Sequence, residues 1–392
     1  MPTPTRLSLI LILAALTAFG PLSIDMYLPA FPGIARDFGA PMDRVELSLT
    51  AFFAGLALGQ LLFGTISDRF GRKAPLYAGL LLYIAASIAC ARAPGVNALI
   101  ALRFVQALGG CAGMVISRAS VRDLFDPREA ARVFSLLMLV MGVAPILAPV
   151  IGGYVTQVWG WRAIFGIVAV FATACLLAVR FLLPETRGAD PSVRLSRTFH
   201  TYGSILRQPH FLGYAVTGAA AQAGMFAYIT GSPFVFIEHF GIPARHYGWV
   251  FGTNALGLIA VSQLNGMLLR KHAPEALLRV SSPLICGFGL LLGLASLLDA
   301  GLWGIALPLF LYVATLGAVF PNTIATALSR QGRQAGAASA LVGTLQFTLA
   351  FASSAAVSLM HAHSARPMAL TLAGCGLISW ATHRWISRIR VS

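Results

Sequence analysis

Charged residues are scarce in this 392-residue sequence, since Asp, Glu, Lys and Arg together make up only 10% of it. Soluble domains carry about 25% charged residues, so the composition excludes an ordinary soluble protein. The hydrophobic share of 57% also excludes a disordered chain, which would be poor in apolar residues. At roughly 20 residues for each membrane helix, the chain has room for about a dozen spans and for no sizeable soluble domain.

Cysteine is rare as well, and the common catalytic motifs are absent. The five cysteines lie singly in apolar stretches without C-x-x-C spacing, so we interpret them as reduced core residues. The sequence contains no Walker A motif, no H-E-x-x-H and no G-x-S-x-G. His361 and His363 form a short pair that has no third ligand beside it. We therefore expect no enzymatic activity, no cofactor and no metal site.

Twelve apolar runs follow one another along the chain. Each run can satisfy its own backbone hydrogen bonds as a helix, which a lipid environment requires. The first run is too long for a signal peptide, and many more follow it. The sequence therefore predicts an all-α membrane protein with twelve transmembrane helices, at about Leu7–Phe31, Val45–Ile66, Pro75–Ala93, Asn97–Ser117, Ala130–Val155, Trp161–Leu183, Phe211–Phe236, Tyr247–Leu269, Leu277–Leu298, Leu302–Ala325, Gly336–Leu359 and Pro367–Trp385.

The net charge of +15 is spread over the short loops between these runs, a distribution that records membrane topology rather than nucleic-acid binding. With the N-terminus placed in the cytoplasm, 21 of the 28 Lys and Arg residues fall in or beside cytoplasmic loops and 6 in outer loops. Since cytoplasmic loops carry the excess of positive charge, both termini are predicted to be cytoplasmic.

The longest polar stretch, Pro184 to His210, divides the runs into two sets of six. We therefore predict an N-terminal six-helix bundle over residues 1–183, a cytoplasmic linker over 184–210 and a C-terminal six-helix bundle over 211–392. A weak internal repeat agrees with this division, because Ala57-Leu58-Gly59 and Arg72-Lys73 both recur 198 residues later. The two bundles are predicted to be pseudo-symmetric.

The loop after the second run reads Gly64-Thr-Ile-Ser-Asp-Arg-Phe-Gly-Arg-Lys73. Glycine at positions 64 and 71 permits close helix approach and a tight turn, and Asp68 can accept hydrogen bonds from a helix N-terminus or from an arginine. An ordinary basic cytoplasmic loop explains the arginines and the lysine, but not the two glycines and the aspartate at this spacing. The stretch matches G-x-x-x-D-R-x-G-R-[KR], a loop signature of the major facilitator superfamily.

The fourth run contains Arg103 inside an apolar helix, which costs about 2.5–3.5 kcal/mol on insertion scales. Two interpretations remain open. Either Arg103 faces a polar cavity or a partner, or it extends toward the nearby membrane face. The stretch Arg103 to Gly110 resembles the family motif R-x-x-Q-G, with Ala107 in place of the first glycine.

The fifth run resembles the motif that marks the antiporters of this superfamily, G-x-x-x-G-P-x-x-G-G, with Ala148 at one glycine position. Small residues let helices pack closely, and proline bends the span. The alternative is a bent packing helix with no bearing on transport direction. The glycines and prolines of this run are Gly142, Pro145, Pro149, Gly152 and Gly153, of which Pro149, Gly152 and Gly153 stand at defined positions of the motif.

Asp25 is the only carboxylate embedded among apolar neighbours within a predicted span. Such a group can gain and lose a proton as water reaches it from alternate sides of the membrane. The alternative is an aspartate near a helix end that the outer interface keeps wet, which the neighbouring prolines permit.

Taken together, these segments resemble the Bcr/CflA branch of the drug:proton antiporters. The resemblance extends over most of the chain and includes Pro21-Leu-Ser-Ile-Asp-Met-Tyr-Leu-Pro29 and Ser232-Pro-Phe-Val-Phe-Ile-Glu238. It implies the major facilitator fold, with substrate bound between the two halves near the midplane. It also implies a cytoplasmic latch between the two halves in the outward-facing state, formed by Gly64, Asp68, Arg69, Gly71, Arg72 and Asp123. Our hypothesis for proton coupling is that Asp25 carries the proton and that Arg103 tunes its proton affinity or orients the substrate.

Six further residues are candidate substrate contacts. Those of the second half place polar or aromatic groups within apolar runs, where hydrogen bonding or packing between helices is the alternative explanation. The candidates are Met26, Gln222, Phe226, Tyr228, Asn254 and Gln346.

We therefore expect a secondary active multidrug efflux transporter that exchanges protons for small, mostly apolar drugs across the bacterial inner membrane by alternating access. The alternative is a proton-coupled exporter of a metabolite such as an amino acid or a nucleoside. A membrane-embedded enzyme or a channel is disfavoured. The expected partners are the substrate, protons and the lipid bilayer, with no nucleic acid, and the chain is expected to act as a monomer.

Overall fold

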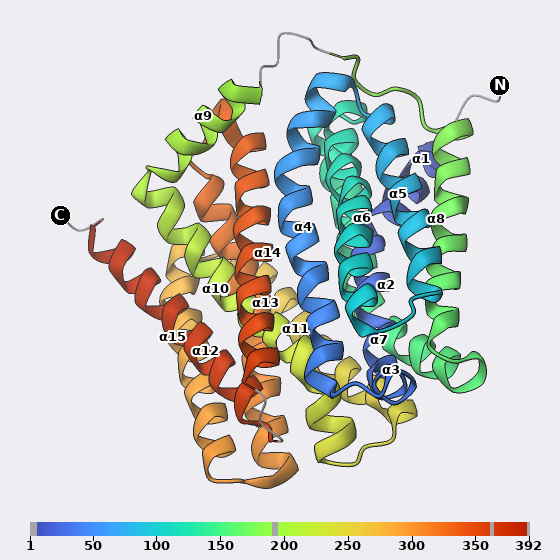
Figure 1. The fold of residues 1–392 in the computed structure, drawn as a ribbon. Coiled ribbons are helices and arrows are strands. Elements are labelled where there is room, and N and C mark those ends of the chain that lie inside the picture. The colour runs from blue at the N-terminus through green and yellow to red at the C-terminus, as the bar shows by residue number, and fades with distance from the viewer. Residues whose placement is uncertain (1–5, 190–194, 361–363, 390–392) are drawn as a thin grey trace. The chain divides into compact units, whose positions relative to one another are not determined.

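The computed structural model describes residues 6–189, 195–360 and 364–389, which form helices and turns with no β-strand among them (Figure 1). Contacts within the chain define two compact units. Unit 1 contains Met1–Pro41 and Ala51–Thr198, and unit 2 contains Met42–Thr50 and Phe199–Ser392. His361 and His363 lie outside the described residues. Among those described, no group of three or more His, Cys, Asp or Glu side chains could hold a metal ion.

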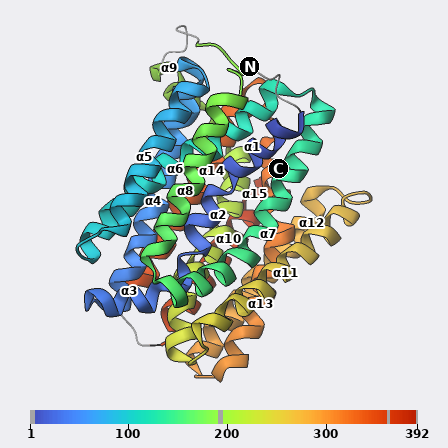
Figure 2. The same ribbon diagram turned by 90° about the vertical axis from the view of Figure 1, so that its right-hand side faces the viewer.

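The first predicted span is a broken helix (Figures 1 and 2). It consists of α1 (Arg6–Thr17), α2 (Phe19–Asp25), the 3₁₀ turn η1 (Leu28–Ala30) and α3 (Phe31–Phe38). Proline has no N–H group, so Pro21 cannot donate to the carbonyl of Thr17, and Pro29 cannot donate to that of Asp25. These missing donors account for the end of α1 at Thr17 and of α2 at Asp25.

The remaining long helices of unit 1 follow the predicted runs to within four residues, except that α6 ends at Leu124, seven residues beyond its predicted end. One of them, α4, also contributes its first residues to unit 2. They are α4 (Met42–Phe70), α5 (Lys73–Ala91), α6 (Val96–Leu124), α7 (Pro127–Trp159) and α8 (Arg162–Leu182).

Unit 2 is built from the helices of the second half. An additional helix, α9 (Leu195–Leu206), lies within the predicted linker and was not expected from the polar sequence. It is followed by α10 (Pro209–Ser232), the π-helical turn η2 (Pro233–His239), α11 (Ala244–Leu268), α12 (Pro274–Leu297), α13 (Gly301–Leu328), the 3₁₀ turn η3 (Gly332–Gln334), α14 (Ala335–Leu359) and α15 (Arg366–Ile389).

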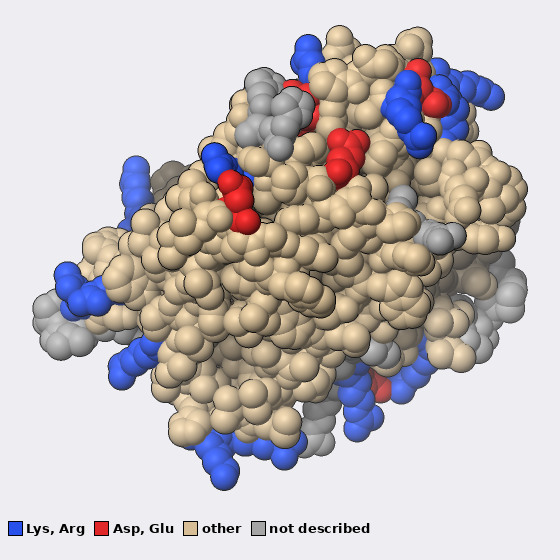
Figure 3. Space-filling model, turned by 90° about the horizontal axis from the view of Figure 1, so that it is seen from below, with Lys and Arg blue, Asp and Glu red and all other residues tan. Residues whose placement is uncertain are grey.

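Each of the twelve predicted runs coincides with a helix. Within the described residues, ten of these helical segments are long and apolar enough to cross a membrane. The other two runs are the more polar helices α11 and α15. The face in Figure 3 is mostly uncharged, and large apolar side chains such as Trp303 (80% exposed) and Val170 (71% exposed) lie on the surface. Exposed apolar surface of this extent suits contact with lipid.

Candidate functional site

Arg103 of α6 is held inside unit 1, with 1% of the residue exposed. Its Nη1 donates to Oε1 of Gln106 at 2.6 Å, and its Nη2 donates to the carbonyl oxygen of Ser23 at 2.9 Å. Ser23 belongs to α2, so the guanidinium links α6 directly to the broken first span. Both contacts lie in the protein interior, which shows that Arg103 does not extend to the membrane face.

These contacts belong to a closed hydrogen-bonded ring that joins α2, α5 and α6. Gln106 donates from Nε2 to Ser87 Oγ at 2.8 Å, and Ser87 donates to the carbonyl of Tyr83 at 2.7 Å. The Tyr83 hydroxyl returns to Ser23 through a hydrogen bond of 2.6 Å with its Oγ. We call these five residues the Arg103 ring. Because each side chain holds the next, the ring fixes the position of the guanidinium.

Aromatic rings supply the rest of the surroundings of Arg103. The guanidinium carbon lies 4.4 Å from the ring centroid of Tyr27, 4.1 Å from that of Phe52 and 5.8 Å from that of Phe165. Such cation–π contacts stabilise a desolvated cation. Within the described residues Nε has no hydrogen-bond partner, and no carboxylate forms an ion pair with Arg103. The groups that the structure describes around this charge are therefore all neutral.

Asp25 is the last residue of α2 and is 4% exposed. Among the described residues it forms no ion pair with Arg103 or with any other cation. Arg103 instead holds the backbone two residues earlier, at Ser23. The two predicted proton-coupling residues therefore meet through one short helix and not through a salt bridge.

The antiporter-type motif reaches the same segment from α7. A Cβ added at Gly152 would overlap the carbonyl oxygen of Met26, the residue after Asp25. Only glycine permits this close approach. Pro145 and Pro149 lie within α7 before this contact, while Gly142 lies almost three turns before it and Gly153 is its buried neighbour. Gly152, at a defined position of the motif, therefore contacts the Asp25 segment.

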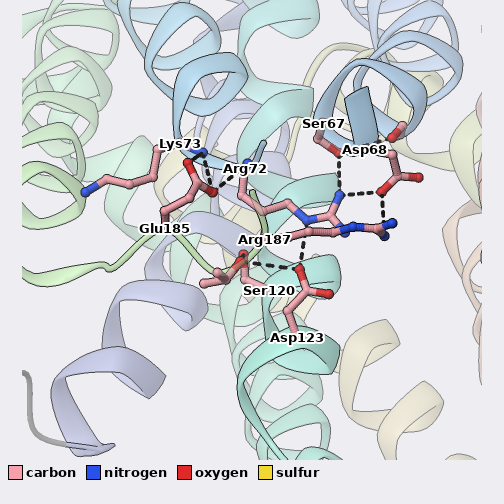
Figure 4. A network of polar contacts seen from close by, with 10 residues as sticks. Ser67, Asp68, Arg72, Lys73, Ser120, Asp123, Glu185 and Arg187 are labelled. Carbon is pink, nitrogen blue, oxygen red and sulfur yellow. Dashed lines mark hydrogen bonds and ion pairs between the residues drawn. The ribbon is translucent and has the colours of Figure 1, made fainter. Parts of the chain in front are cut away.

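The loop between α4 and α5 forms the second polar site of unit 1 (Figure 4). Arg72 is 3% exposed, and its guanidinium donates from Nη1 to Asp68 Oδ1 at 2.7 Å and to Ser67 Oγ at 2.9 Å. Its Nε donates to Oδ2 of Asp123, at the end of α6, at 2.8 Å. Burial lowers the pKa of Arg72, but the hydrogen bonds and charges of Asp123 and Asp68 raise it by more. The guanidinium therefore stays protonated.

The sequence did not predict that the residues after α8 complete this site. Glu185 accepts hydrogen bonds from the backbone N–H groups of Arg72 (2.7 Å) and Lys73 (3.2 Å) at the start of α5. Arg187 Nη1 lies 3.6 Å from Asp68 Oδ1, and Thr186 donates to Asp123 at 3.3 Å. The only sequence signal was an acidic residue, Glu185, in a basic linker. The resulting loop cluster consists of Ser67, Asp68, Arg72, Asp123, Glu185, Thr186 and Arg187.

Position 71 requires glycine, because the chain after α8 passes close to the loop between α4 and α5 there. Its φ of +82° lies in the region that favours glycine, and an added Cβ would lie 3.2 Å from the carbonyl oxygen of Arg187. The other two predicted latch residues lie apart from the ion pairs. Arg69 has its guanidinium 5.4 Å from the ring of Phe70, and Gly64 accepts a hydrogen bond from Ser67 within α4.

Unit 2 brings the remaining substrate candidates together in two groups. Asn254 of α11 donates to the hydroxyl of Tyr228 on α10 at 3.0 Å, so these two candidates form a bond between helices. Phe226 of α10 packs against Phe347 of α14, with ring centroids 5.8 Å apart. Gln222 and Gln346 lie on the same two helices as this ring pair.

The comparison with known protein families agrees with the family that the sequence motifs indicated. The sequence model of the Major Facilitator Superfamily matches residues 13–355. The chain belongs to this superfamily. It is therefore a multi-pass membrane transporter of small molecules and not an enzyme.

Several relatives narrow the placement within the superfamily. The chain is 36% identical to an uncharacterised MFS-type transporter of Bacillus subtilis, YdgK, over 88% of this chain and 87% of the relative. It is 33% identical to the bicyclomycin resistance protein homolog of Haemophilus influenzae over 94% of each chain. It is 31% identical to the multidrug resistance protein MdtL of Citrobacter koseri over 85% of this chain and 84% of the relative. These relatives support the Bcr/CflA branch that the motifs predicted.

Solved structures support the twelve-helix fold. A D-xylose-proton symporter matches with a TM-score of 0.74 at 15% identity, covering 97% of both chains. A bacterial homolog of the human lysosomal transporter Spinster matches with a TM-score of 0.70 at 16% identity, covering 99% of this chain and 98% of the other. At these identities the likeness concerns the fold alone, and it confirms the predicted all-α major facilitator architecture.

Proposed function

We propose that this chain is a secondary active efflux transporter that exchanges protons for small, mostly apolar drugs across the bacterial inner membrane. The printed names of two relatives, which concern bicyclomycin resistance and multidrug resistance, support drug export. The excess of Lys and Arg in alternate loops supports cytoplasmic placement of both termini. The bundles over residues 1–183 and 211–392 act as the two moving halves of a monomer.

Asp25 is the proton carrier in this proposal. The supporting observation is a buried carboxylate, without a paired cation among the described residues, at a break in a membrane helix. Leaving a charge unpaired inside a membrane protein costs free energy, so the ionised form requires water or a bound partner. Alternating access supplies water from one side at a time, which lets Asp25 bind a proton from one side and release it to the other.

Arg103 couples this proton to movement of the first span. The guanidinium holds Ser23, which belongs to the same short helix as Asp25, so a shift of α2 alters both groups together. Ionised Asp25 favours the inward-facing state that accepts drug, and protonation from outside favours drug release. Coupling requires only that the two ligands stabilise different states, not that they touch.

The loop cluster is the unit 1 part of the cytoplasmic latch in this proposal. Asp68, Arg72 and Asp123 join the end of α4 to the end of α6, and Glu185 ties the start of α5 to the chain leaving α8. Four helix ends are thereby held as one body. Gly71 is needed for the turn, while Gly64 and Arg69 support it from α4.

Proton-driven uptake of bicyclomycin into everted membrane vesicles tests the proposal. The variant Asp25→Asn keeps the shape of the side chain and removes its ionisation, so we expect uptake to fall to the level of vesicles without the protein. Asp37→Asn is the matched control, because Asp37 pairs with Arg162 and accepts a hydrogen bond from Trp161 Nε1 at 2.8 Å, and an asparagine oxygen can still accept from both. We expect this variant to retain uptake. Undiminished uptake by Asp25→Asn, at equal protein level, would overturn the assignment.

A further inference from the structure

A second buried carboxylate lies at the start of α4, among the residues that this helix contributes to unit 2. Glu46 is the second residue of the predicted run Val45–Ile66, and the structure leaves only 5% of it exposed. Among the described residues it forms no ion pair. An ionised carboxylate is costly in such a place unless a cation or several hydrogen bonds compensate its charge. The proposed exchange at Asp25 gives this buried acid no role.

The charged groups around Glu46 make its ionised form less favourable still. The carboxylates of Asp43 on α4 and Glu238 on η2 act on it, and both carry the same sign of charge. The nearby basic groups, Arg44 of α4 and His239 of η2, are exposed. Helices α10 and α14 contain no Asp, Glu, Lys or Arg. Because like charges repel each other at close range, a proton bound to Glu46 relieves this site.

A row of buried hydroxyl groups joins the same stretch of α4 to α14. Thr50, one turn after Glu46, shares a hydrogen bond of 2.6 Å with Ser354 of α14, and Ser354 shares one of 2.8 Å with Thr230 of α10. Ser358, one turn further along α14, is the hydrogen-bonding partner of the Glu46 side chain. We call Thr50, Thr230, Ser354 and Ser358 the hydroxyl row. Each of the four is at most 3% exposed, so the row excludes water from the carboxyl group.

The hydroxyl of Ser358 is placed to accept a hydrogen bond from Glu46. A serine hydroxyl has one hydrogen, and that of Ser358 is donated to the carbonyl oxygen of Ser354 at 3.1 Å. Toward Glu46 it therefore offers its lone pairs. An ionised carboxylate only accepts hydrogen bonds, whereas a protonated one has an O–H group to donate. The hydroxyl row consequently suits the protonated form of Glu46.

We propose that Glu46 is a second proton-binding site, and that its protonated form fastens the start of α4 to α14. The carboxylic acid donates its O–H to Ser358, beside the bond between Thr50 and Ser354. Loss of the proton leaves an unpaired charge next to two other carboxylates and opposite an acceptor, so the start of α4 separates from α14. This inference goes beyond the proposed exchange, because the contact responds to pH whether or not Asp25 carries the exchanged proton.

Infrared spectroscopy of the purified full-length protein in lipid nanodiscs tests whether Glu46 holds a proton. We expect a carboxylic acid C=O band at about pH 6, where an exposed glutamate is already ionised, and its loss at about pH 9. Glu46→Gln keeps the shape of the side chain and should remove this band. A band from Asp25 would persist in the variant, so the difference between the two proteins isolates Glu46. Identical acid bands in both proteins would overturn the proposal.

Two variants of α14 test the partner of the acid. Ser358→Ala removes the acceptor and should shift the Glu46 band. Thr344→Val is the matched control, because the Thr344 hydroxyl bonds within α14 to the carbonyl oxygen of Ala340, and it should leave the band in place. An unshifted band in Ser358→Ala would remove the proposed contact.

The distance between spin labels on the two helices tests the fastening. Labels are attached at Arg44→Cys on α4 and Leu359→Cys on α14, both exposed positions, after the five native cysteines, which are buried, have been replaced by alanine. We expect the distance to lengthen between the same two pH values in the protein with Glu46, and to stay short at both in Glu46→Gln. A constant distance with Glu46 present, or equal lengthening in Glu46→Gln, would overturn the proposal.

Asp299→Asn is the carboxylate control for this distance, because Asp299 forms an exposed pair with Arg366. It should lengthen as the protein with Glu46 does. Glu46→Met, which also removes the charge, replaces Glu46→Gln if that variant fails to fold. Both experiments use neither a drug nor a proton gradient, so failure at Glu46 is distinguishable from failure of the exchange proposed for Asp25.

Discussion

Unit 1 buries two arginines to nearly the same extent and surrounds them in opposite ways. Arg72, 3% exposed, binds the carboxylates of Asp68 and Asp123. Arg103, 1% exposed, has only a carbonyl, an amide and aromatic rings around it among the described residues. A charge neutralised by fixed carboxylates holds a structure together. A buried charge without a counter-ion responds strongly to any charge that appears nearby, because screening is weak in the interior.

The second half of the chain repeats the basic pair of this loop without its acidic partner. Arg270 and Lys271, which stand 198 residues after Arg72 and Lys73, are exposed and form no ion pair among the described residues. Position 266, equivalent to Asp68, is glycine. A neutral bond from Asn322 to Asn265 joins α13 to α11 instead. The charged loop cluster is therefore a property of unit 1 and not of the repeat.

The largest expected difference between the two arginines is in transport by lysine variants. Lysine lacks the planar fork that reaches both Ser23 and Gln106, so Arg103→Lys should reduce proton-driven bicyclomycin uptake to background. At Arg72 a lysine still pairs with one carboxylate, so Arg72→Lys should reduce uptake only by a factor on the order of ten. Uptake into everted vesicles at matched protein levels measures both. Equal losses in the two variants would contradict the distinction.

A smaller effect is expected on stability, at the carboxylates of the loop cluster. The side chain of Asp123 is 19% exposed and that of Asp68 is 43% exposed. We expect Asp123→Asn to lower the free energy of unfolding by about 1–3 kcal/mol and Asp68→Asn by less than about 1 kcal/mol, because exposure to solvent weakens the second ion pair. Denaturant unfolding in detergent micelles measures both. The control Asp299→Asn removes a highly exposed pair with Arg366 and should have no measurable effect. The reverse order of the two cluster variants would refute this ranking.

The smallest effect concerns Glu185, which caps the start of α5. Glu185→Ala removes the acceptor for the backbone N–H groups of Arg72 and Lys73, at an expected cost of about 0.5–1 kcal/mol. The segment that follows is then held less firmly, so trypsin should cleave after Arg187 severalfold faster. Glu129→Ala, which removes an exposed pair with Arg6, should leave the cleavage rate unchanged. An unchanged rate of tryptic cleavage in Glu185→Ala would show that Glu185 does not hold this segment in place.

The sequence predicted the helices and the motif residues because both are local patterns. Apolar runs report which segments prefer lipid, and all twelve runs coincide with helices. The loop signature has fixed spacing, so Asp68, Gly71 and Arg72 were found directly.

The contacts between distant segments could not be predicted in the same way. Glu185 lies 113 residues from Arg72, in a linker whose polarity says nothing about its contacts. Ser23, Tyr83 and Ser87 are common residues that become the Arg103 ring only when three helices meet. Whether Asp25 pairs with Arg103 depends on the residue at which α2 ends. That end is determined by proline, which has no N–H group to donate to the preceding turn.

Proton release on drug binding tests most directly whether Asp25 carries the exchanged proton. Bicyclomycin is added to the purified protein in weakly buffered detergent solution, and a pH indicator records the protons that leave. We predict that the unaltered protein releases protons when it binds the drug, and that Asp25→Asn binds the drug and releases none. Release from Asp25→Asn equal to that of the unaltered protein would contradict the account.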